Sequence, residues 1–440
     1  MTYERMNGWV LGLVLLAVMA GMTAFGGEPA ERFPRPDFES GYTPPATQRP
    51  LPRAEIMQWV DVGALAGTLT LTAWLVLKRR SRKGILAVTV FSIAYFGFYR
   101  QGCVCSVGAI QNVVLGLSGG GYSVPWPVIL FFLLPLVFAL FFGRVFCAAV
   151  CPLGAIQDVM VRKPLKVSGV LAGLLGFLPV VLLGLSVLLT AVGAGFMICK
   201  YDPFVGFYRM GGAVSMLVSG GVLLVLGMFV ARPYCRYLCP YGVLLGWMSK
   251  LAGRHARITP DQCIDCRLCE KACPFESIRP STVEKLPEKP AVIRKRMVWA
   301  IASLFLLVGV GILFGMAMYQ PLARVHPLIR LAERVALEER GVVKGYTVES
   351  EAFRGAGQSL EDLRAQAVVL QGRFRSGGMM VGAFLGLVLG LRAIAMSRVE
   401  LRKEYSIDQG TCFSCGRCFE YCPVGRRMGE EEGSGFGVPV

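Results

Sequence analysis

Cysteines are the residues of this 440-residue chain that are best suited to chemistry, and the chain has 15 of them. They stand in groups at short spacing instead of being spread along the sequence. In a reducing compartment, grouped thiols favour metal ligation over a disulfide framework. The chain has 2 histidines, His255 and His326, which excludes a multi-haem protein with histidine axial ligands.

Two segments share the spacing C-x2-C-x2-C-x3-C-P: "CIDCRLCEKACP" at 263–274 and "CFSCGRCFEYCP" at 412–423. Bacterial ferredoxins hold [4Fe–4S] clusters with this run, and its fourth cysteine usually binds the neighbouring cluster. Four cysteines can also hold structural zinc, but two copies with the terminal proline favour iron–sulfur. The ligand sets predicted on this basis are Cys263, Cys266, Cys269 and Cys422 for one cluster, and Cys412, Cys415, Cys418 and Cys273 for the other.

A second pair of phrases carries the pattern C-x3-C-P: "FCAAVCPLGAI" at 146–156 and "YCRYLCPYGVL" at 234–244. In a helix, residues four apart lie on one face, and the following proline suits the first turn of a new helix. We expect these thiols to meet at the inner membrane face, as a third iron–sulfur cluster, a Cu(I) site, a redox-active dithiol set, or cysteines that only pack between helices. The four residues are Cys147, Cys151, Cys235 and Cys239.

The elements that position these cysteines are membrane helices, because the chain is 54% hydrophobic with a mean hydropathy of +0.55. Apolar blocks of membrane-spanning length predict eight spans, at 8–25, 57–77, 85–99, 126–143, 168–192, 212–231, 298–318 and 379–396. The first is either a retained anchor, which we favour, or a cleaved signal peptide. Lys/Arg blocks at 78–83, 161–166, 294–296 and 398–403 place both chain ends and both ferredoxin motifs in the cytoplasm. The net charge of +17 then reflects anchoring at anionic lipid, not nucleic-acid binding.

A third phrase, "QGCVCSVGAIQN" at 101–112, repeats the second pattern, with Cys105 aligned on Cys151. Only one predicted span separates the two copies, so this copy is expected at the outer face. Cys199 is expected at the same face. Cys103, Cys105 and Cys199 would therefore form an outer thiol group, either as a structural disulfide that includes Cys199 or as a redox or metal site.

The predicted fold is an all-α polytopic membrane protein of about eight transmembrane helices, with a small cytoplasmic 2[4Fe–4S] module of bacterial-ferredoxin type. The segment 320–376 is expected to form a pair of amphipathic helices on the outer membrane surface, or a docking platform, with Gly341 ending the first helix and Ser359 capping the second. Asp61 and Asp202 lie near the outer ends of spans, where they are either solvated or able to take protons from a quinol. The expected parts are 1–56 (anchor and Pro-rich linker), 57–254 (transmembrane core), 255–297 (first ferredoxin motif), 298–396 (two helices and the external segment) and 397–440 (second motif and tail).

The phrases "GRVFCAAVCPLGAIQD" and "RPYCRYLCPYGVLLG" resemble the NosR/NapH family of membrane polyferredoxins, over about residues 57–275. The resemblance implies electron transfer between the quinol pool or the cytoplasm and a periplasmic reductase system. The chain lacks a recognisable periplasmic flavin domain of NosR type, and its second ferredoxin motif follows two additional spans, unlike NapH. More distant relatives with similar C-x3-C-P motifs include copper-reducing assembly proteins.

No nucleophile triad, phosphate loop or dinucleotide fingerprint is present, so bound cofactors must supply the chemistry. We therefore expect an iron–sulfur electron-transfer protein of the bacterial cytoplasmic membrane, compatible with a subunit of a quinol-linked oxidoreductase. Its expected partners are membrane lipid, the quinone pool and a periplasmic flavoprotein or reductase. A copper-reducing assembly factor and a redox-sensing regulator are the alternatives.

Overall fold

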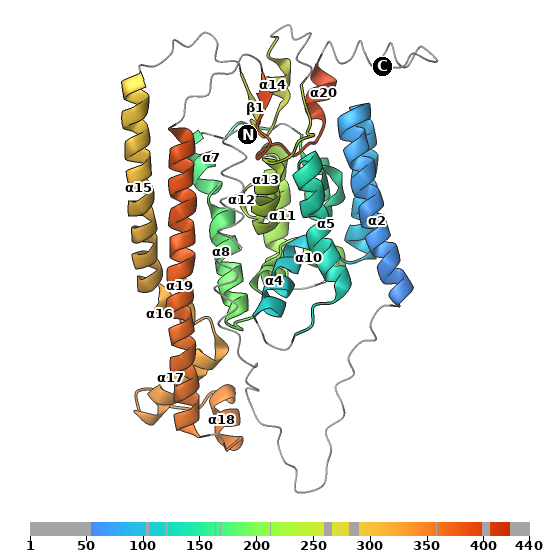
Figure 1. Cartoon of the computed structure of the whole chain (residues 1–440). Coiled ribbons are helices and arrows are strands. Elements are labelled where there is room, and N and C mark those ends of the chain that lie inside the picture. Colours follow the sequence, from blue (N-terminus) through green and yellow to red (C-terminus); the bar gives the residue numbers. More distant parts are fainter. Residues whose placement is uncertain are drawn as a thin grey trace.

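The computed structural model describes residues 54–102, 105–118, 122–162, 164–167, 169–211, 213–258, 266–280, 290–357, 359–397 and 405–422. The predicted span 8–25 and the predicted ligands Cys103 and Cys263 lie outside these residues. The described chain forms an upright bundle of helices with a small module at one end (Figure 1). We call this the module end of the bundle, and the other end the distal end.

The longer helices of the bundle are α2 (Glu55–Trp74) with its π-helical continuation η1 (Leu75–Arg79), α3 (Arg82–Ser92) with η2 (Ile93–Tyr99), α5 (Trp126–Phe142), α8 (Leu178–Ala191) and α11 (Val214–Phe229). Shorter pieces lie between them: α4 (Ser106–Leu117), η3 (Phe146–Val150), α6 (Pro152–Met160), α7 (Gly169–Leu175), α9 (Met197–Tyr201), α10 (Val205–Arg209), α12 (Pro233–Tyr237) and α13 (Pro240–Ser249). The C-terminal part contributes α14 (Leu268–Ala272), β1 (Ile278–Arg279), α15 (Pro290–Ala317), α16 (Tyr319–Ala323), α17 (Pro327–Glu339), α18 (Val348–Gly355), α19 (Leu360–Met396), β2 (Ser406–Ile407) and α20 (Arg417–Tyr421).

Among the described residues, four helices are long and apolar enough to cross a membrane: Glu55–Arg79, Gly169–Ala191, Ala291–Ala317 and Leu360–Met396. They coincide with the predicted spans 57–77, 168–192, 298–318 and 379–396. The predicted spans 126–143 and 212–231 are the shorter apolar helices α5 and α11, and the span 85–99 is the helix formed by α3 and η2. The chain is thus a helical membrane protein with several crossings, while the count of eight stays a prediction.

The cysteine-bearing segment 232–249 enters the bundle and turns back inside it. Its last residue, Ser249, donates to the carbonyl of Gln409 at the module end (2.8 Å). Its middle reaches much deeper, because the Tyr241 hydroxyl donates to the carbonyl of Phe132 (2.6 Å), about halfway along α5. The turn lies at Cys239, whose backbone is extended (ψ 109°), and Pro240 begins α13 directly after it.

The segment 143–160 is built in the same way. Arg144 donates to the carbonyl of Gly410 at the module end (3.1 Å), whereas the carbonyl of Pro152 accepts from Tyr208 inside the bundle (2.6 Å). Cys151 is extended (ψ 118°) and divides η3 from α6. One expectation is therefore wrong: Cys147 and Cys151 do not share one face of a continuous helix. Both residues are buried inside the bundle. The expected proline start of a new helix is confirmed at Pro152 and Pro240.

The segment that begins with Cys105 approaches the same depth. Ser106 donates to the carbonyl of Phe131 (2.7 Å), next to the residue that Tyr241 contacts, and α4 runs from there toward the distal end (Figure 1). The start of α4 thus lies inside the bundle, while the expectation that this copy lies at the outer face stays a prediction. The short half-helices approach the middle of the bundle from both ends, which is typical of discontinuous membrane helices.

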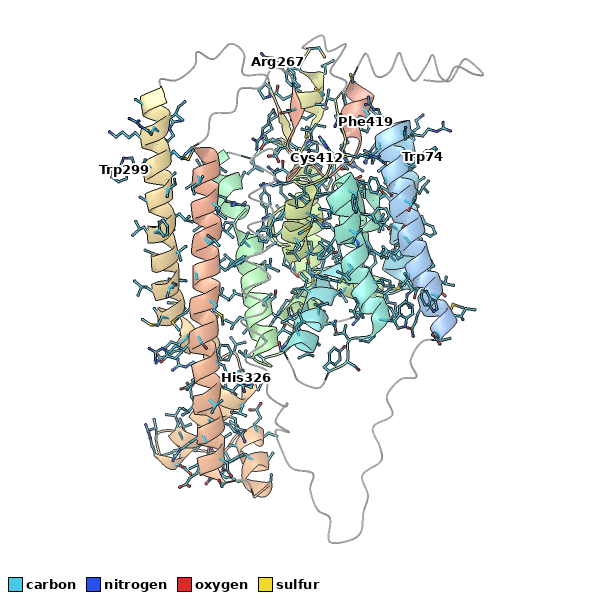
Figure 2. All side chains as sticks on the ribbon, in the orientation of Figure 1. Trp74, Arg267, Trp299, His326, Cys412 and Phe419 are labelled. Carbon is cyan, nitrogen blue, oxygen red and sulfur yellow. The ribbon has the colours of Figure 1, made fainter. Side chains whose placement is uncertain are left out.

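The two ferredoxin motifs form one module although they are far apart in sequence. Strands β1 and β2 pair antiparallel, with Ile278 opposite Ile407 and Arg279 opposite Ser406. Helices α14 and α20 lie side by side at the module end, and Cys412 lies where the module meets the bundle (Figures 1 and 2). The prediction that both motifs emerge on one side of the helices is confirmed.

Helices α15 and α19 pair along most of their length beside the cysteine-bearing core (Figure 1). Glycines allow the two backbones to touch: a Cβ at Gly378 would lie 2.8 Å from the carbonyl oxygen of Gly315. Such small-residue contacts are typical of helix pairs in membranes. Trp74 on α2 and Trp299 on α15 are exposed near the module end, at a similar height (Figure 2), as in the aromatic belts of membrane proteins.

The predicted external segment 320–376 lies at the distal end (Figure 1). Helix α17 ends just before Gly341, and the Ser359 hydroxyl caps α19 by accepting from the amide of Asp362 (3.1 Å), as predicted. The second predicted amphipathic helix is not separate, however. It is the first part of the 37-residue helix α19, which continues without a break into the span 379–396.

Candidate functional site

The second ferredoxin motif and the end of the first enclose a pocket in the module. Its thiol lining consists of Cys273, Cys412, Cys415 and Cys418, the set predicted for one cluster, and its apolar lining includes Phe275 and Phe413. Burial raises the pKa of the Cys412 thiol to about 12, so without a metal this thiol is protonated at neutral pH. Four soft ligands around an apolar pocket fit a [4Fe–4S] cluster, whose binding would release these protons.

The other predicted module cluster is described in part. Cys269 lies on α14 and Cys422 directly follows α20, the two helices that pack together. Cys266 is exposed just before α14. Since Cys263 lies outside the described residues, this second ligand set stays a prediction.

Beneath the module, four buried thiols gather in the middle of the bundle: Cys147, Cys151, Cys235 and Cys239. We call them the central thiol site. The thiol of Cys151 lies within electrostatic range of the other three. The structure thus brings together the two C-x3-C-P pairs, as predicted from their repetition.

Hydrogen-bond donors surround the sulfur atoms of the central thiol site. Gln157 Nε2 donates to Cys235 Sγ (3.4 Å), the amide of Gly242 donates to Cys239 Sγ (3.4 Å), and Arg144 donates to Cys147 Sγ (3.8 Å). Donors of this kind stabilise negative charge on sulfur, which suits thiolate ligands. Within the described part of the chain, no three Cys, His, Asp or Glu side chains are placed to hold a single metal ion.

Arg144 also connects the central thiol site to the module. Its guanidinium lies 4.1 Å from the ring centroid of Phe413, the residue after the predicted ligand Cys412. Phe413 in turn packs on Phe275 from the first motif (4.5 Å between ring centroids). Arg232 lies on the other side, 5.8 Å from the Phe413 ring, and donates to the carbonyl of Cys147. A continuous chain of packed side chains thus joins the two groups of thiols.

Comparisons with known proteins match these sites. A family described as "4Fe-4S binding domain" matches residues 124–177 and 213–259, which hold all of the central thiol site, and a second family of that description matches residues 255–278. An uncharacterized protein of Methanocaldococcus jannaschii is 31% identical over 216 residues, which cover 47% of this chain and 86% of that protein. YccM of Escherichia coli is 29% identical over 186 residues (38% of this chain, 52% of YccM), and the regulatory protein NosR of Pseudomonas aeruginosa is 30% identical over 241 residues (46% of this chain, 30% of NosR). No solved structure matches the chain.

The chain belongs to the NosR/NapH-type family of ferredoxin-type membrane proteins. As a member of this family, it is an iron–sulfur membrane protein related to electron-transport proteins. It spans about half the length of YccM and less than a third of NosR, so the activities of those whole proteins do not transfer directly.

A buried carboxylate ties the module of this NosR/NapH-type protein to its core, and sequence reasoning missed it. Asp158 pairs with Arg82 (2.5 Å), Arg232 (3.2 Å) and Arg417 (3.5 Å), which come from the start of α3, the loop before α12 and α20. Arg82 also donates to the carbonyl of Cys415 (2.8 Å). Only the phrase "GAIQD" at 154–158 could have pointed to Asp158, since its partners are distant in sequence.

The predicted outer thiols of this NosR/NapH-type protein are brought together as well. The sulfur atoms of Cys105 and Cys199 both approach Gly108, because a Cβ at Gly108 would lie 3.9 Å and 2.8 Å from them. Asp61 is not solvated: it is 1% exposed, pairs with Arg100 (3.0 Å) and accepts from Tyr95 (2.9 Å).

Proposed function

We propose that this protein carries electrons through the membrane, between the ferredoxin module at one end and a redox partner at the other. The observation that carries the proposal is the contact of Arg144 with both Phe413 of the module and Cys147 of the central thiol site. When bound, iron–sulfur clusters supply one-electron transfer. The side chains hold the two thiol groups in direct packing, so that little protein separates them.

We assign a third [4Fe–4S] cluster to Cys147, Cys151, Cys235 and Cys239, next to two clusters in the module. The donor set is all sulfur, it is buried, and it lies within the match to a 4Fe-4S binding domain. Hydrogen bonds from Gln157 and Gly242 orient two of the sulfur atoms. This arrangement supports a cluster with four cysteine ligands at the middle of the membrane.

We place the module in the cytoplasm of a bacterial cell. The densest Lys/Arg block, at 78–83, lies at the module end, where Arg80 reaches the ring of Phe419 (5.9 Å). Positive charge concentrates in cytoplasmic loops, which supports this orientation. The distal end, with α16, α17 and α18, then faces the periplasm.

We propose two classes of partner for the distal end: the quinone pool and a periplasmic flavoprotein or reductase. A partner must approach within the reach of electron transfer, and the hydrocarbon layer is about 30 Å thick. The helices α17 and α18 extend beyond the bundle at that end and provide a platform for docking (Figure 1).

Anaerobic purification of the full chain followed by iron, sulfide and copper analysis tests this proposal. We expect Cys235→Ser and Cys147→Ser each to lose about four iron atoms while the module clusters remain. Cys415→Ser serves as the matched variant, which should lose module iron but not the central cluster. Unchanged iron in both central variants would overturn the assignment, and loss of stoichiometric copper instead would favour a copper-reducing assembly factor.

A measurement of electron flux distinguishes an electron-carrying protein from a redox-sensing regulator. In vesicles that contain the protein, reduction of the module from one side should reduce a membrane-impermeant dye on the other. Cys235→Ser should reduce that transfer at least tenfold. Transfer that is absent from the wild type under these conditions would favour a sensor.

A further inference from the structure

The surroundings of Cys199 repeat those of Cys235. Gln157 Oε1 accepts from the amide of Tyr234, the residue before Cys235 (3.0 Å). Gln111 occupies the same place in the phrase "GAIQ" and accepts from the amides of Ile198 (3.1 Å) and Cys199 (3.3 Å). Cys199 therefore occupies, toward the distal end, the position that corresponds to that of Cys235 nearer the module.

Two glycines show the same correspondence between the segments. A Cβ at Gly154 would lie 3.5 Å from Cys235 Sγ, and a Cβ at Gly108 would lie 2.8 Å from Cys199 Sγ. Cys105, which aligns with Cys151, accepts from the amide of Gly108 with its Sγ (3.4 Å). In both places glycine leaves room for a sulfur atom of the neighbouring segment, so the space beside Cys105 and Cys199 is built in the same way as the central thiol site.

Asp202 takes the place of the fourth central cysteine. It stands before Pro203 as Cys239 stands before Pro240, and each begins a turn toward a short helix. Its carboxylate accepts from the amide of Phe204 (2.9 Å), just as Cys239 Sγ accepts from the amide of Gly242 (3.4 Å). Asp202 is 3% exposed and lies within electrostatic range of Cys105.

We propose that Cys105, Cys199 and Asp202 form a second iron–sulfur site inside the membrane, which we call the distal site. It rests on the proposed function, because it is argued from likeness to the central thiol site. The two sites are the counterparts of an internal repeat in which half-helices approach from opposite ends. Its ligands are two thiolates and one carboxylate, whereas the central site has four thiolates, so the two sites differ in redox potential.

Two tyrosines lie between the central and the distal site. Tyr234 packs edge-on against Phe204 (5.4 Å between centroids) and lies within electrostatic range of Asp202, Cys105 and Cys235. Tyr208 lies within range of Asp202 and Cys151. Cys105, Cys199 and Asp202 would thus hold a one-electron acceptor closer to the distal end than the central thiols do.

Iron content and electron paramagnetic resonance of the full chain, purified without oxygen, test the distal site. Cys105→Ser and Cys199→Ser should each lose about four iron atoms and one cluster signal while the central and module signals remain. Asp202→Cys should keep the iron, because cysteine is the residue at the equivalent position 239, and should shift the potential of one cluster. Lys200→Ala, an exposed neighbour, is the matched control and should change nothing.

Protection of Cys199 gives a readout that does not depend on the folding of a variant. Cys199 is exposed, so in the protein without iron its thiol should react rapidly with a maleimide. We expect protection in the iron-loaded protein and labelling after iron is removed with a chelator, measured by mass spectrometry. Equal labelling in both states, or unchanged iron in Cys105→Ser and Cys199→Ser, would overturn the distal site. If Cys235→Ser also left the iron unchanged, the proposed function would fail with it.

Discussion

The guanidinium of Arg144 lies over the ring of Phe413, 4.1 Å from its centroid, and joins the membrane core to the second ferredoxin motif. The same guanidinium donates to Cys147 Sγ and to the carbonyl of Gly410. A positive charge therefore lies between the module cysteines and the central thiol site, where it would stabilise the reduced form of a cluster held by either group.

Replacing Arg144 by methionine removes this charge and both hydrogen bonds but keeps an unbranched side chain. Losing a hydrogen bond to a charged group costs about 1.5–3 kcal/mol, so the midpoint potential of the central cluster should fall by at least about 60 mV. Redox titration followed by electron paramagnetic resonance measures this shift. Arg144→Lys keeps the charge without the planar contact and should give a smaller fall. An unchanged potential in Arg144→Met would contradict the role given to Arg144.

Asp158→Asn should detach the module from the core. It leaves Arg82, Arg232 and Arg417 without their shared carboxylate in a buried place, and breaking a buried pair costs about 3–5 kcal/mol. Thermal unfolding in detergent, followed by the release of iron, measures the loss. Glu333→Gln is the control, since its pair with Arg324 is exposed and should cost less than about 1 kcal/mol. Equal unfolding temperatures for the two variants would show that the buried pairs do not hold the module.

Gly382→Val should separate α15 from α19. A Cβ at Gly382 would overlap the carbonyl oxygen of Gly311, so the backbones must move apart, at a cost of about 1–3 kcal/mol. Gly309→Val adds the same side chain on α15 where nothing lies within 4 Å, and should be tolerated. Limited proteolysis of the full chain in detergent, with the cleavage sites mapped by mass spectrometry, reports on the pairing. Equal cleavage of both variants would argue against close glycine packing.

The distal helices α17 and α18 should loosen in acid. Burial alone raises the pKa of Glu338, but hydrogen bonds from Ser350, Arg334 and Arg354 outweigh it and lower the pKa. The stabilisation is therefore present above the unfolded value of about 4.3 and is lost as the pH falls through the folded pKa. Hydrogen exchange of residues 327–355 at about pH 6 and about pH 3.5 should show the opening.

Glu338→Gln should make that exchange much less dependent on pH, because the group no longer titrates. Glu339→Gln is the matched control, since its pair with Arg364 is exposed and should leave the pH dependence in place. Identical pH profiles for Glu338→Gln and the wild type would show that another group governs the opening.

The sequence predicted which cysteines gather together better than it predicted the path of the chain around them. Repeated spacing identified the module and the central thiol site, because ligand spacing is local and survives without knowledge of the fold. Hydropathy could not reveal that the chain turns at Cys151 and Cys239, since a half-helix that enters and leaves at one end is as apolar as a span. Hydropathy also divided α19 into an external helix and a membrane span, although one continuous helix contains both.

Contacts between residues that are distant in sequence could not be predicted for a related reason. Asp158 lies 76 residues from Arg82 and 259 from Arg417, so no local pattern marks the group. Asp202 escaped notice as a counterpart of Cys239 because it stands three residues after Cys199, whereas Cys239 stands four after Cys235. The shared contacts of Gln111 and Gln157, and of the glycines three residues before each, align the two segments.

The pairing of β1 with β2 bears on how the protein is made. The two strands are 129 residues apart in the chain, and the hairpin of α15 and α19 lies between them. Translation must therefore run past the last membrane helix before Cys273 can meet Cys412, Cys415 and Cys418. Biogenesis is thereby ordered: membrane insertion of the C-terminal hairpin comes first, and delivery of iron and sulfide to this pocket comes afterwards.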